Sequence, residues 1–310
     1  VSAPDYETKS SYTATVTASD GTDTSTQAIT VNITDENESP VFTSSATFSV
    51  AENQTAIGTV IASDPEGGTI RFTISGSELQ ITSAGVLTFK SAPDYETKAT
   101  YTATVFANDP TDKTTAQAIT VNVTDVNDAP VFTSSATFSA AENQTAIGTV
   151  TATDADGDSV TFSVSGSELA ITLAGVLTFA SAPDYETKSS YTATVTASDG
   201  TDSTNQSITV NITDIDEAPA FTSSATFTAD ENQTAIGTAI AIDPEDETIT
   251  YSLNDATIEM NESTGVLTFI SAPDFETKNL YETTLTASDG TNSTTQSITV
   301  NVTDVNEAPA

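Results

Sequence analysis

A repeat of about 90 residues constrains this chain more than any other feature of its sequence. The octapeptide SAPDYETK begins at Ser2, Ser91 and Ser181, and SAPDFETK begins at Ser271, so the intervals are 89, 90 and 90 residues. This period suits a small domain with its own core, whereas solenoid units of about 20–50 residues depend on their neighbours. Prolines at 40, 130, 219 and 309 keep the same spacing. We therefore expect complete repeats at 41–130, 131–219 and 220–310, and the C-terminal part of another repeat at 1–40.

Each repeat consists of short segments in which apolar and polar residues alternate. Ile119, Val121 and Val123, for example, alternate with Thr and Asn residues, as in a strand with one buried face. No segment carries a sustained helical period. The clearest predicted strands of the first complete repeat are 58–64, 69–75, 85–91, 100–109 and 118–125. About seven strands per repeat predict an all-β chain, a tandem array of immunoglobulin-like β-sandwiches.

Aromatic residues recur at fixed places in every repeat. We interpret them as one core per repeat; the alternative is a set of platforms on which sugars stack. In the first complete repeat they are Phe42, Phe48, Phe72, Phe89, Tyr95 and Tyr101.

The composition excludes several classes of function. The chain has 44 acidic and 7 basic residues, a formal net charge of −37, so it cannot neutralise the phosphates of a nucleic acid or dock on anionic lipid. Its lack of cysteine and histidine removes disulfides, thiolate or imidazole metal ligands, and the commonest catalytic bases. Such a charge opposes compaction unless cations offset it. Two interpretations remain, a cation-binding protein or a strongly solvated surface suited to salty water.

The acidic residues gather in turns and at the junctions between repeats. Hard cations such as Ca²⁺ take six to eight oxygen ligands, and alternate Asp residues in a tight turn can supply several. Clustered carboxylates without a cation would repel one another. The sequence therefore predicts a divalent-cation site; the alternative is that acidic turns only keep the surface solvated. In the second complete repeat these residues are Glu142, Asp154, Asp156, Asp158, Asp184, Glu186, Asp199, Asp214, Asp216 and Glu217.

Five short motifs in fixed order carry a resemblance to a known family. They are Ala-Glu-Asn, Asp-x-Asp, Asp-Tyr-Glu, Ala-x-Asp and a closing Asp-x-Asn-Asp-x-Pro. In these motifs, over essentially its whole length, the chain resembles the cadherin family and specifically bacterial cadherin-like tandem repeats. The resemblance implies seven-stranded Greek-key sandwiches with Ca²⁺ bound between successive repeats, so that the ion makes the array rigid.

The resemblance also implies which residues hold the ions at each junction, here called a joint. The upstream repeat supplies the Glu of Ala-Glu-Asn, the acids of Asp-Tyr-Glu and the residues of the closing junction motif; the downstream repeat supplies an acidic pair and a later Asp. For the first joint this gives Asp5, Glu7, Asp35, Asn37, Glu38, Asp64, Glu66 and Asp109. For the middle joint it gives Glu52, Asp94, Glu96, Asp125, Asn127, Asp128, Asp154, Asp156 and Asp199. For the last joint it gives Glu142, Asp184, Glu186, Asp214, Asp216, Glu217, Asp243, Glu245 and Asp289.

The outer two joints depart from the family pattern. Glu38 and Glu217 replace the final junction Asp, and Glu66 and Glu245 replace the second Asp of the pair. Each change adds a methylene and more rotamer entropy to be lost on ordering. We expect the middle joint to fill at the lowest calcium concentration, and the outer joints to bind fewer ions or to bind them more weakly.

The sequence favours a structural role over a catalytic one. We expect a calcium-rigidified spacer of a long surface or secreted protein, or a segment of an extracellular fibre; the alternative is a calcium-dependent adhesin that recognises cells, itself or glycans. An enzyme is not expected. We expect an extracellular or cell-surface location, in a bacterium, without a membrane span in this segment. Since residues 1–40 cannot close a sandwich, we expect the rest of that repeat to lie upstream; the alternative is that a neighbouring molecule completes it.

Overall fold

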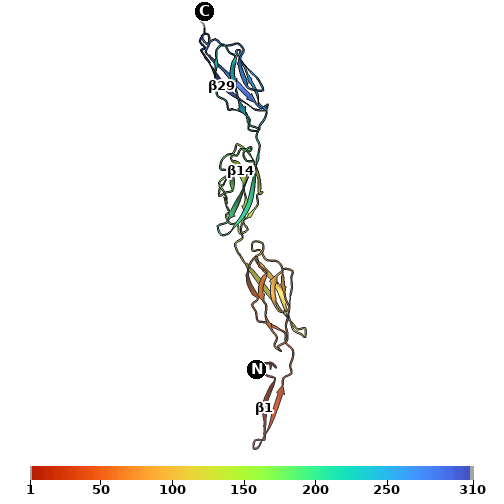
Figure 1. Cartoon of the computed structure of the whole chain (residues 1–310). Helices are drawn as coiled ribbons and strands as arrows, with labels where there is room; N and C mark the ends of the chain where they lie inside the picture. Colours follow the sequence, from red (N-terminus) through yellow and green to blue (C-terminus); the bar gives the residue numbers. More distant parts are fainter. Residues whose placement is uncertain (1, 308–310) are drawn as a thin grey trace. The chain divides into compact units, whose positions relative to one another are not determined.

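The computed structural model describes residues 2–307, so the expected marker Pro309 lies outside the described residues. These residues form strands only, which confirms the all-β prediction (Figure 1). Without a helix they contain no helical segment able to cross a membrane. The chain divides into two compact units, residues 1–128 with 155–158, and residues 129–154 with 159–310. Each unit is described on its own.

The strands form one hairpin and three sets of nine. The hairpin consists of β1 (Ser11–Ser19) and β2 (Thr24–Asn32). The first set contains β3 (Val41–Phe42), β4 (Thr47–Ala51), β5 (Ala56–Thr59), β6 (Ala62–Ser63), β7 (Arg71–Ile74), β8 (Leu79–Ile81), β9 (Val86–Phe89), β10 (Thr100–Asn108) and β11 (Thr114–Thr124). The second contains β12 (Val131–Phe132), β13 (Thr137–Ala141), β14 (Ala146–Thr149), β15 (Ala152–Thr153), β16 (Thr161–Val164), β17 (Leu169–Ile171), β18 (Val176–Phe179), β19 (Ser190–Ser198) and β20 (Ser203–Thr213). The third contains β21 (Ala220–Phe221), β22 (Thr226–Asp230), β23 (Ala235–Thr238), β24 (Ala241–Ile242), β25 (Thr250–Leu253), β26 (Ile258–Met260), β27 (Val266–Phe269), β28 (Leu280–Ser288) and β29 (Ser293–Thr303).

All three sets share one sheet topology. In the first set, one sheet has the order β4-β11-β10-β7, a second has β5-β9-β8, and β3 pairs with β6. The long strands β10 and β11 pair antiparallel, whereas β4 joins β11 in parallel. Two parallel strands cannot be connected by a tight hairpin turn. The chain between β4 and β11 therefore passes through the other sheet, as in a β-sandwich.

Alternation places a separate core inside each set. In β11 the predicted inward residues Ile119, Val121 and Val123 are all buried, while the Thr and Asn residues between them stay more exposed. Two predicted boundaries were wrong. Segment 58–64 contains parts of two short strands, β5 and β6, because the buried Val60 between them donates its N–H to the carbonyl of Gly85 (2.8 Å). The last strand also begins at Thr114 rather than at 118.

Gly85 permits that close approach. Its φ is +88°, and a Cβ at this position would lie 2.3 Å from the carbonyl oxygen of Val60. Only glycine fits such a left-handed, crowded backbone position without strain. The contact therefore joins the strand β9 to the segment between β5 and β6.

The aromatic residues mostly pack inside the sandwich, as the core interpretation predicts. Phe72 and Phe89 are buried, and the ring of Phe89 meets Tyr101 edge-on at 4.9 Å between centroids. Tyr95 is the exception, since 36% of its surface is exposed. Most of these rings are thus core residues rather than platforms for a ligand.

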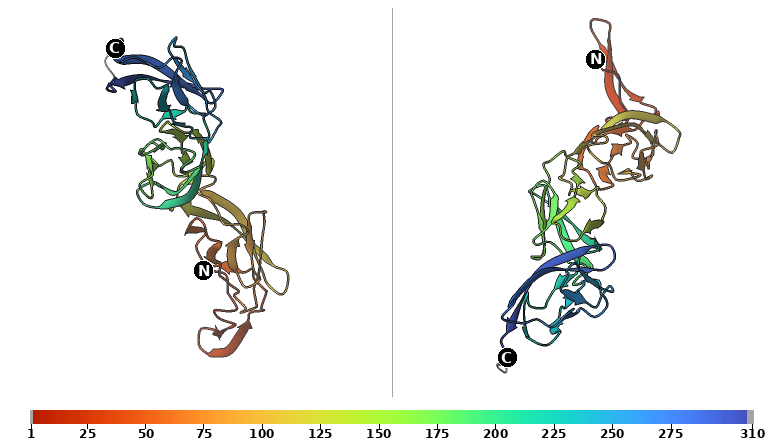
Figure 2. Two further views of the ribbon diagram at one scale, coloured as in Figure 1. Left: turned by 45° about the horizontal axis from the view of Figure 1, so that its top comes forward. Right: turned by 90° about the horizontal axis from the view of Figure 1, so that it is seen from above.

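The hairpin β1–β2 forms a two-stranded sheet by itself (Figures 1 and 2). Its register runs from Ser11 opposite Asn32 to Ser19 opposite Thr24. Every residue of both strands is exposed. Among residues 2–307 no second sheet covers these strands, unlike those of the three sets, and an isolated hairpin is at best marginally stable in water.

Candidate metal sites

A buried glutamate directly follows β4, β13 and β22. Glu142 is 2% exposed, and its carboxylate accepts hydrogen bonds from the backbone N–H of Tyr185 and of Ile215, both at 2.8 Å. Glu52 and Glu231 make the same pair of contacts in their own sets. Each glutamate thereby links two segments of its own set. One is the acidic loop that precedes the two long strands, and the other is the segment that follows the last strand.

The asparagine after that glutamate was missed by sequence reasoning. Asn53, Asn143 and Asn232 adopt left-handed backbone conformations, with φ between 60° and 62°. Asn tolerates this region better than other residues with a side chain. Its amide reaches the last acid of the junction; Asn232 donates to Glu307 at 2.7 Å, and Asn143 donates to Glu217. The recurrence of Asn directly after the same Glu in all three sets was the available signal.

The first joint lies within the first unit and brings together acids from 1–40 and from the first set. Ligand oxygens of Glu7, Asp35 and Glu66 lie within 4.8 Å of one another. The Asn37 amide donates to Asp109 (2.7 Å), and the backbone N–H of Glu38 donates to Glu66 (3.0 Å). These contacts juxtapose six of the eight predicted residues, while Asp5 caps its own turn.

Part of the predicted middle joint also lies within the first unit. Oxygens of Glu52, Asp94 and Glu96 fall within 4.8 Å, and so do those of Glu96, Asp125 and Asp156. The backbone N–H of Asp128 donates to Asp156 at 2.8 Å. The other predicted residues of this joint are Asn127, whose amide lies 3.4 Å from the carbonyl of Asp128, and Asp154 and Asp199, which belong to the second unit.

The last joint lies entirely within the second unit. Oxygens of Glu142, Glu186 and Glu217 lie within 4.8 Å of one another, and so do those of Glu186, Asp214 and Glu245. The side chain of Asn292 holds Asp216, donating to its backbone carbonyl at 2.9 Å and to its carboxylate at 2.7 Å. Asp184 caps its own turn by accepting from the N–H of Thr187 (2.9 Å).

The downstream acids of the last joint keep buried oxygens that no hydrogen bond satisfies. Asp243 and Asp289 each use one carboxylate oxygen to accept from turn N–H groups, at 2.6–3.2 Å. Their other oxygens are buried without a donor among the described residues, as are both carboxylate oxygens of Glu245. Asp64 repeats this arrangement in the first joint. Unsatisfied buried carboxylate oxygens are costly, so each such oxygen needs a partner.

Burial and contacts with neighbouring carboxylates raise the pKa values of several carboxyl groups in the clusters. Burial and the neighbouring carboxylate of Glu245 raise the pKa of Glu217 to about 7. The contact with Glu66, together with burial, raises the pKa of Glu38 to about 7. Burial and Asp156 raise the pKa of Asp125 as well. In these three groups the folded chain therefore disfavours the charged form of the carboxyl group.

The donor set fits a hard divalent cation. Carboxylate, amide and carbonyl oxygens converge, and the sequence has no thiolate or imidazole to attract a softer metal. The two ion pairs of the described residues, Lys98 with Glu78 and Lys188 with Glu168, lie outside the predicted ligand sets. Oxygens within 4.8 Å of each other can share one Ca²⁺, whose bonds to oxygen are about 2.3–2.6 Å long.

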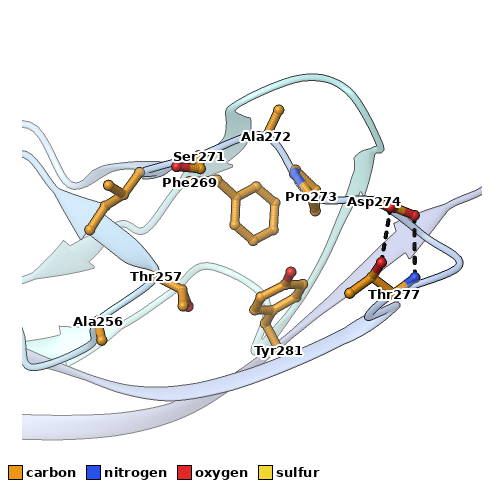
Figure 3. A pocket seen from close by; sticks show the side chains of 10 residues that line it. Ala256, Thr257, Phe269, Ser271, Ala272, Pro273, Asp274, Thr277 and Tyr281 are labelled. Atoms are coloured by element: carbon orange, nitrogen blue, oxygen red, sulfur yellow. Dashed lines mark hydrogen bonds between the residues drawn. The ribbon is translucent and has the colours of Figure 1, made fainter.

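A surface pocket beside β27 and β28 is a separate feature (Figure 3). Phe269, Pro273 and Tyr281 line it, with Asp274 at its edge. That carboxylate accepts from the hydroxyl and the N–H of Thr277, at 2.9 and 3.2 Å. Because its one acidic group is already committed to a turn, we do not place the functional site in this pocket.

Comparison with known proteins supports the same architecture. Residues 127–213 match the family model described as a bacterial Ig domain. The chain is 32% identical over 158 residues to the protocadherin-like wing polarity protein stan of Drosophila melanogaster, covering 44% of this chain and 4% of that protein. It is also 32% identical over 146 residues to cadherin EGF LAG seven-pass G-type receptor 1 of Mus musculus, covering 43% and 5%. The chain thus spans only a small part of these relatives.

Solved structures give a longer match. The extracellular domain of protocadherin γB4 aligns with a TM-score of 0.60 and 25% identity over 97% of this chain and 56% of that one. Extracellular cadherin domains 1–5 of protocadherin γB2 align with a TM-score of 0.60 and 25% identity over 98% and 68%. Three repeats of mouse cadherin-23 match in fold, with a TM-score of 0.55 over 87% of this chain and all of that one. Together with the recurring motifs and the sandwich topology, these matches show that the chain is similar to cadherin tandem repeats in sequence and in fold.

Proposed function

We propose that this chain is a calcium-rigidified spacer in an extracellular or surface protein of a bacterium. Ca²⁺ is held at the joints by acids of the upstream repeat and of the downstream repeat. The boundaries between repeats lie near residues 40, 130 and 219. The binding energy of the ion then appears as order between repeats and as resistance to unfolding.

The observation that carries this proposal is the set of buried oxygens in the last joint. Within the described part of the chain, both oxygens of Glu245 and one each of Asp243 and Asp289 have no hydrogen-bond donor, while Glu186 and Asp214 place further oxygens within 4.8 Å of Glu245. A cation at this place satisfies the buried groups and removes the repulsion between them. It also links three segments that are distant in the sequence.

Small-angle scattering of the full chain with calcium and with EDTA tests this function. A spacer gives a longer, stiffer particle with calcium and a more compact, flexible average on chelation. Scattering profiles that superimpose in the two conditions would contradict the proposal. The proposal that the protein is a bacterial surface protein rests on the family match at 127–213. It is tested separately by cell fractionation or by antibody labelling of intact cells.

One observation favours the alternative role as an adhesin. Leu173, between β17 and β18, is 71% exposed, whereas the first set has Ser83 at this place. An exposed leucine on one repeat can add a contact with a partner or with a second copy. If the chain is an adhesin, Leu173→Ser lowers calcium-dependent self-association measured by light scattering. A spacer shows no such association with or without the substitution.

A further inference from the structure

One lysine stands out among the acids of the first joint. Lys113 lies in the loop between β10 and β11, and its ammonium donates a hydrogen bond to the backbone carbonyl of Asn37. It is therefore a positive charge that reaches a predicted junction of the chain. The last joint has a neutral group in this role, since the Asn292 amide donates to the carbonyl of Asp216 (2.9 Å).

The loop that carries Lys113 is one residue longer than its counterparts. Residues 109–113 separate β10 from β11, whereas 199–202 and 289–292 separate the equivalent strands. The shorter loops have a glycine in second position with positive φ, 103° at Gly200 and 114° at Gly290. Pro110 occupies that position here, and the proline ring forbids a positive φ. Asp112 instead takes the left-handed conformation, with φ of 67°, and the additional residue Lys113 follows it.

The extended loop keeps the contacts of the acid at its start. Asp109 is 5% exposed and accepts hydrogen bonds from the N–H groups of Thr111 (2.8 Å) and Lys113 (2.9 Å). Its other oxygen accepts from the amide of Asn37 (2.7 Å). Asn37 is thus held at two points, by Asp109 through its side chain and by Lys113 through its carbonyl. Neither contact requires a metal ion.

An ammonium and a divalent cation compete for the same kind of partner. Backbone carbonyl oxygens are ordinary ligands of Ca²⁺, and a lysine ammonium is a compact charge with three donors on a flexible stem. The carbonyl of Asn37 lies in the junction that also supplies Asp35 to the cluster with Glu7 and Glu66. A lysine at this carbonyl contributes a positive charge that is part of the chain, so no free ion has to lose translational entropy.

We propose that Lys113 is a built-in cation that takes one coordination position of the first joint, so that this joint binds less calcium and stays partly ordered without it. The inference rests on the proposed function of the joints. It gives the weaker calcium binding that we expect of the first joint a specific cause beyond the longer side chains of Glu38 and Glu66. It also makes the three joints unequal in how they respond to falling calcium.

The test uses the full chain with Lys113→Gln, which keeps a donor of similar length but removes the charge. Lys90→Gln is the matched control, because it makes the same change of charge on an exposed lysine in the same set. Calorimetric titration should show that Lys113→Gln takes up about one more calcium ion per chain than the wild type, and Lys90→Gln none. Equal calcium uptake by the wild type and Lys113→Gln would overturn the inference.

A distance measurement shows the order of the joint directly. The chain has no cysteine, so Thr17→Cys with Thr73→Cys places two spin labels on exposed positions of β1 and β7. In EDTA the distribution of distances between the two labels should be narrow when residue 113 is the native Lys and with Lys113→Arg, and it should be broad with Lys113→Gln. A distribution that Lys113→Gln leaves as narrow as the wild type would refute the role of the lysine. Failure of the wild type to bind any calcium would instead refute the proposed function.

Discussion

The same strand sequence lies in two different environments in this chain. SYTATVTAS forms β1 in the N-terminal hairpin and β19 in the second set. Val16 is 51% exposed in β1, whereas its counterpart Val195 is fully buried. Both strands pair with a following strand over nine residues in the same register. Burial in this fold therefore comes from the strands that precede the hairpin, not from the hairpin itself.

The largest expected effect is a difference in stability between two isoleucine variants at equivalent positions of the two environments. Ile208 of β20 is 1% exposed, and its counterpart Ile29 of β2 is 39% exposed. Ile208→Ala should lower the free energy of unfolding of its set by about 2–5 kcal/mol, since it leaves a cavity in a packed core. Ile29→Ala should change the stability by less than about 0.5 kcal/mol. Thermal and urea unfolding of the two variants measure the difference.

Equal losses from the two isoleucine variants would show that the hairpin is buried in solution. In that case a second copy of the chain or another segment covers it. Analytical ultracentrifugation of the wild type separates these outcomes, because a second copy doubles the mass.

The next effect concerns the buried glutamate, for which residues 1–40 have no counterpart. Glu142→Ala leaves the N–H groups of Tyr185 and Ile215 without their acceptor. We expect a loss of about 1–3 kcal/mol in EDTA, where calcium cannot contribute. Glu168→Ala, at an exposed acid of the same set, is the control and should cost little. Unfolding curves that coincide for Glu142→Ala and Glu168→Ala would contradict the structural role of Glu142.

A smaller effect should appear in the pH dependence without calcium. The pKa values of Glu38 and Glu217 are raised to about 7 in the folded chain. A raised pKa means that the folded state holds its proton more tightly, so this stabilisation is present at low pH and is lost as the pH rises through about 7. In EDTA the melting temperature should therefore fall as the pH rises from about 4.5, the ordinary pKa of Glu, to about 7, and it should level off above that. The double variant Glu38→Gln with Glu217→Gln should flatten this slope, and an unchanged slope would assign it to other groups.

The smallest effect concerns a lysine that stacks on a tyrosine in both regions. Lys188 lies 4.2 Å from the ring centre of Tyr191 and pairs with Glu168, whereas Lys9 lies 4.5 Å from Tyr12 and has no ion pair among the described residues. Exposed pairs of this kind contribute about 0–1 kcal/mol. Lys188→Ala should thus cost slightly more than Lys9→Ala in thermal unfolding. A larger loss from Lys9→Ala would mean that the hairpin has contacts outside this structure.

The sequence predicted the sandwich because its signals are local and repeated. Alternation in β11 and the recurring aromatic positions identify the buried face without knowledge of the partner strands. The clustering of Glu186, Asp214 and Glu245 could be anticipated only through the family resemblance, since these residues come from three separate loops. The two contacts that hold Asn37, with Asp109 and with Lys113, could not be predicted from the sequence. They depend on one inserted residue and on a hydrogen bond between residues that are 76 positions apart. The roles of Asn53, Asn143 and Asn232 required the backbone conformation that follows each buried glutamate.

The most direct test of calcium ordering is a distance measurement across the last joint. Thr192→Cys and Thr284→Cys place spin labels on exposed positions of β19 and β28 in a chain that has no other cysteine. With calcium the distance distribution should be narrow, and with EDTA it should broaden; Glu245→Gln should raise the calcium concentration needed for narrowing. A distribution of the same width with calcium and with EDTA would contradict the account.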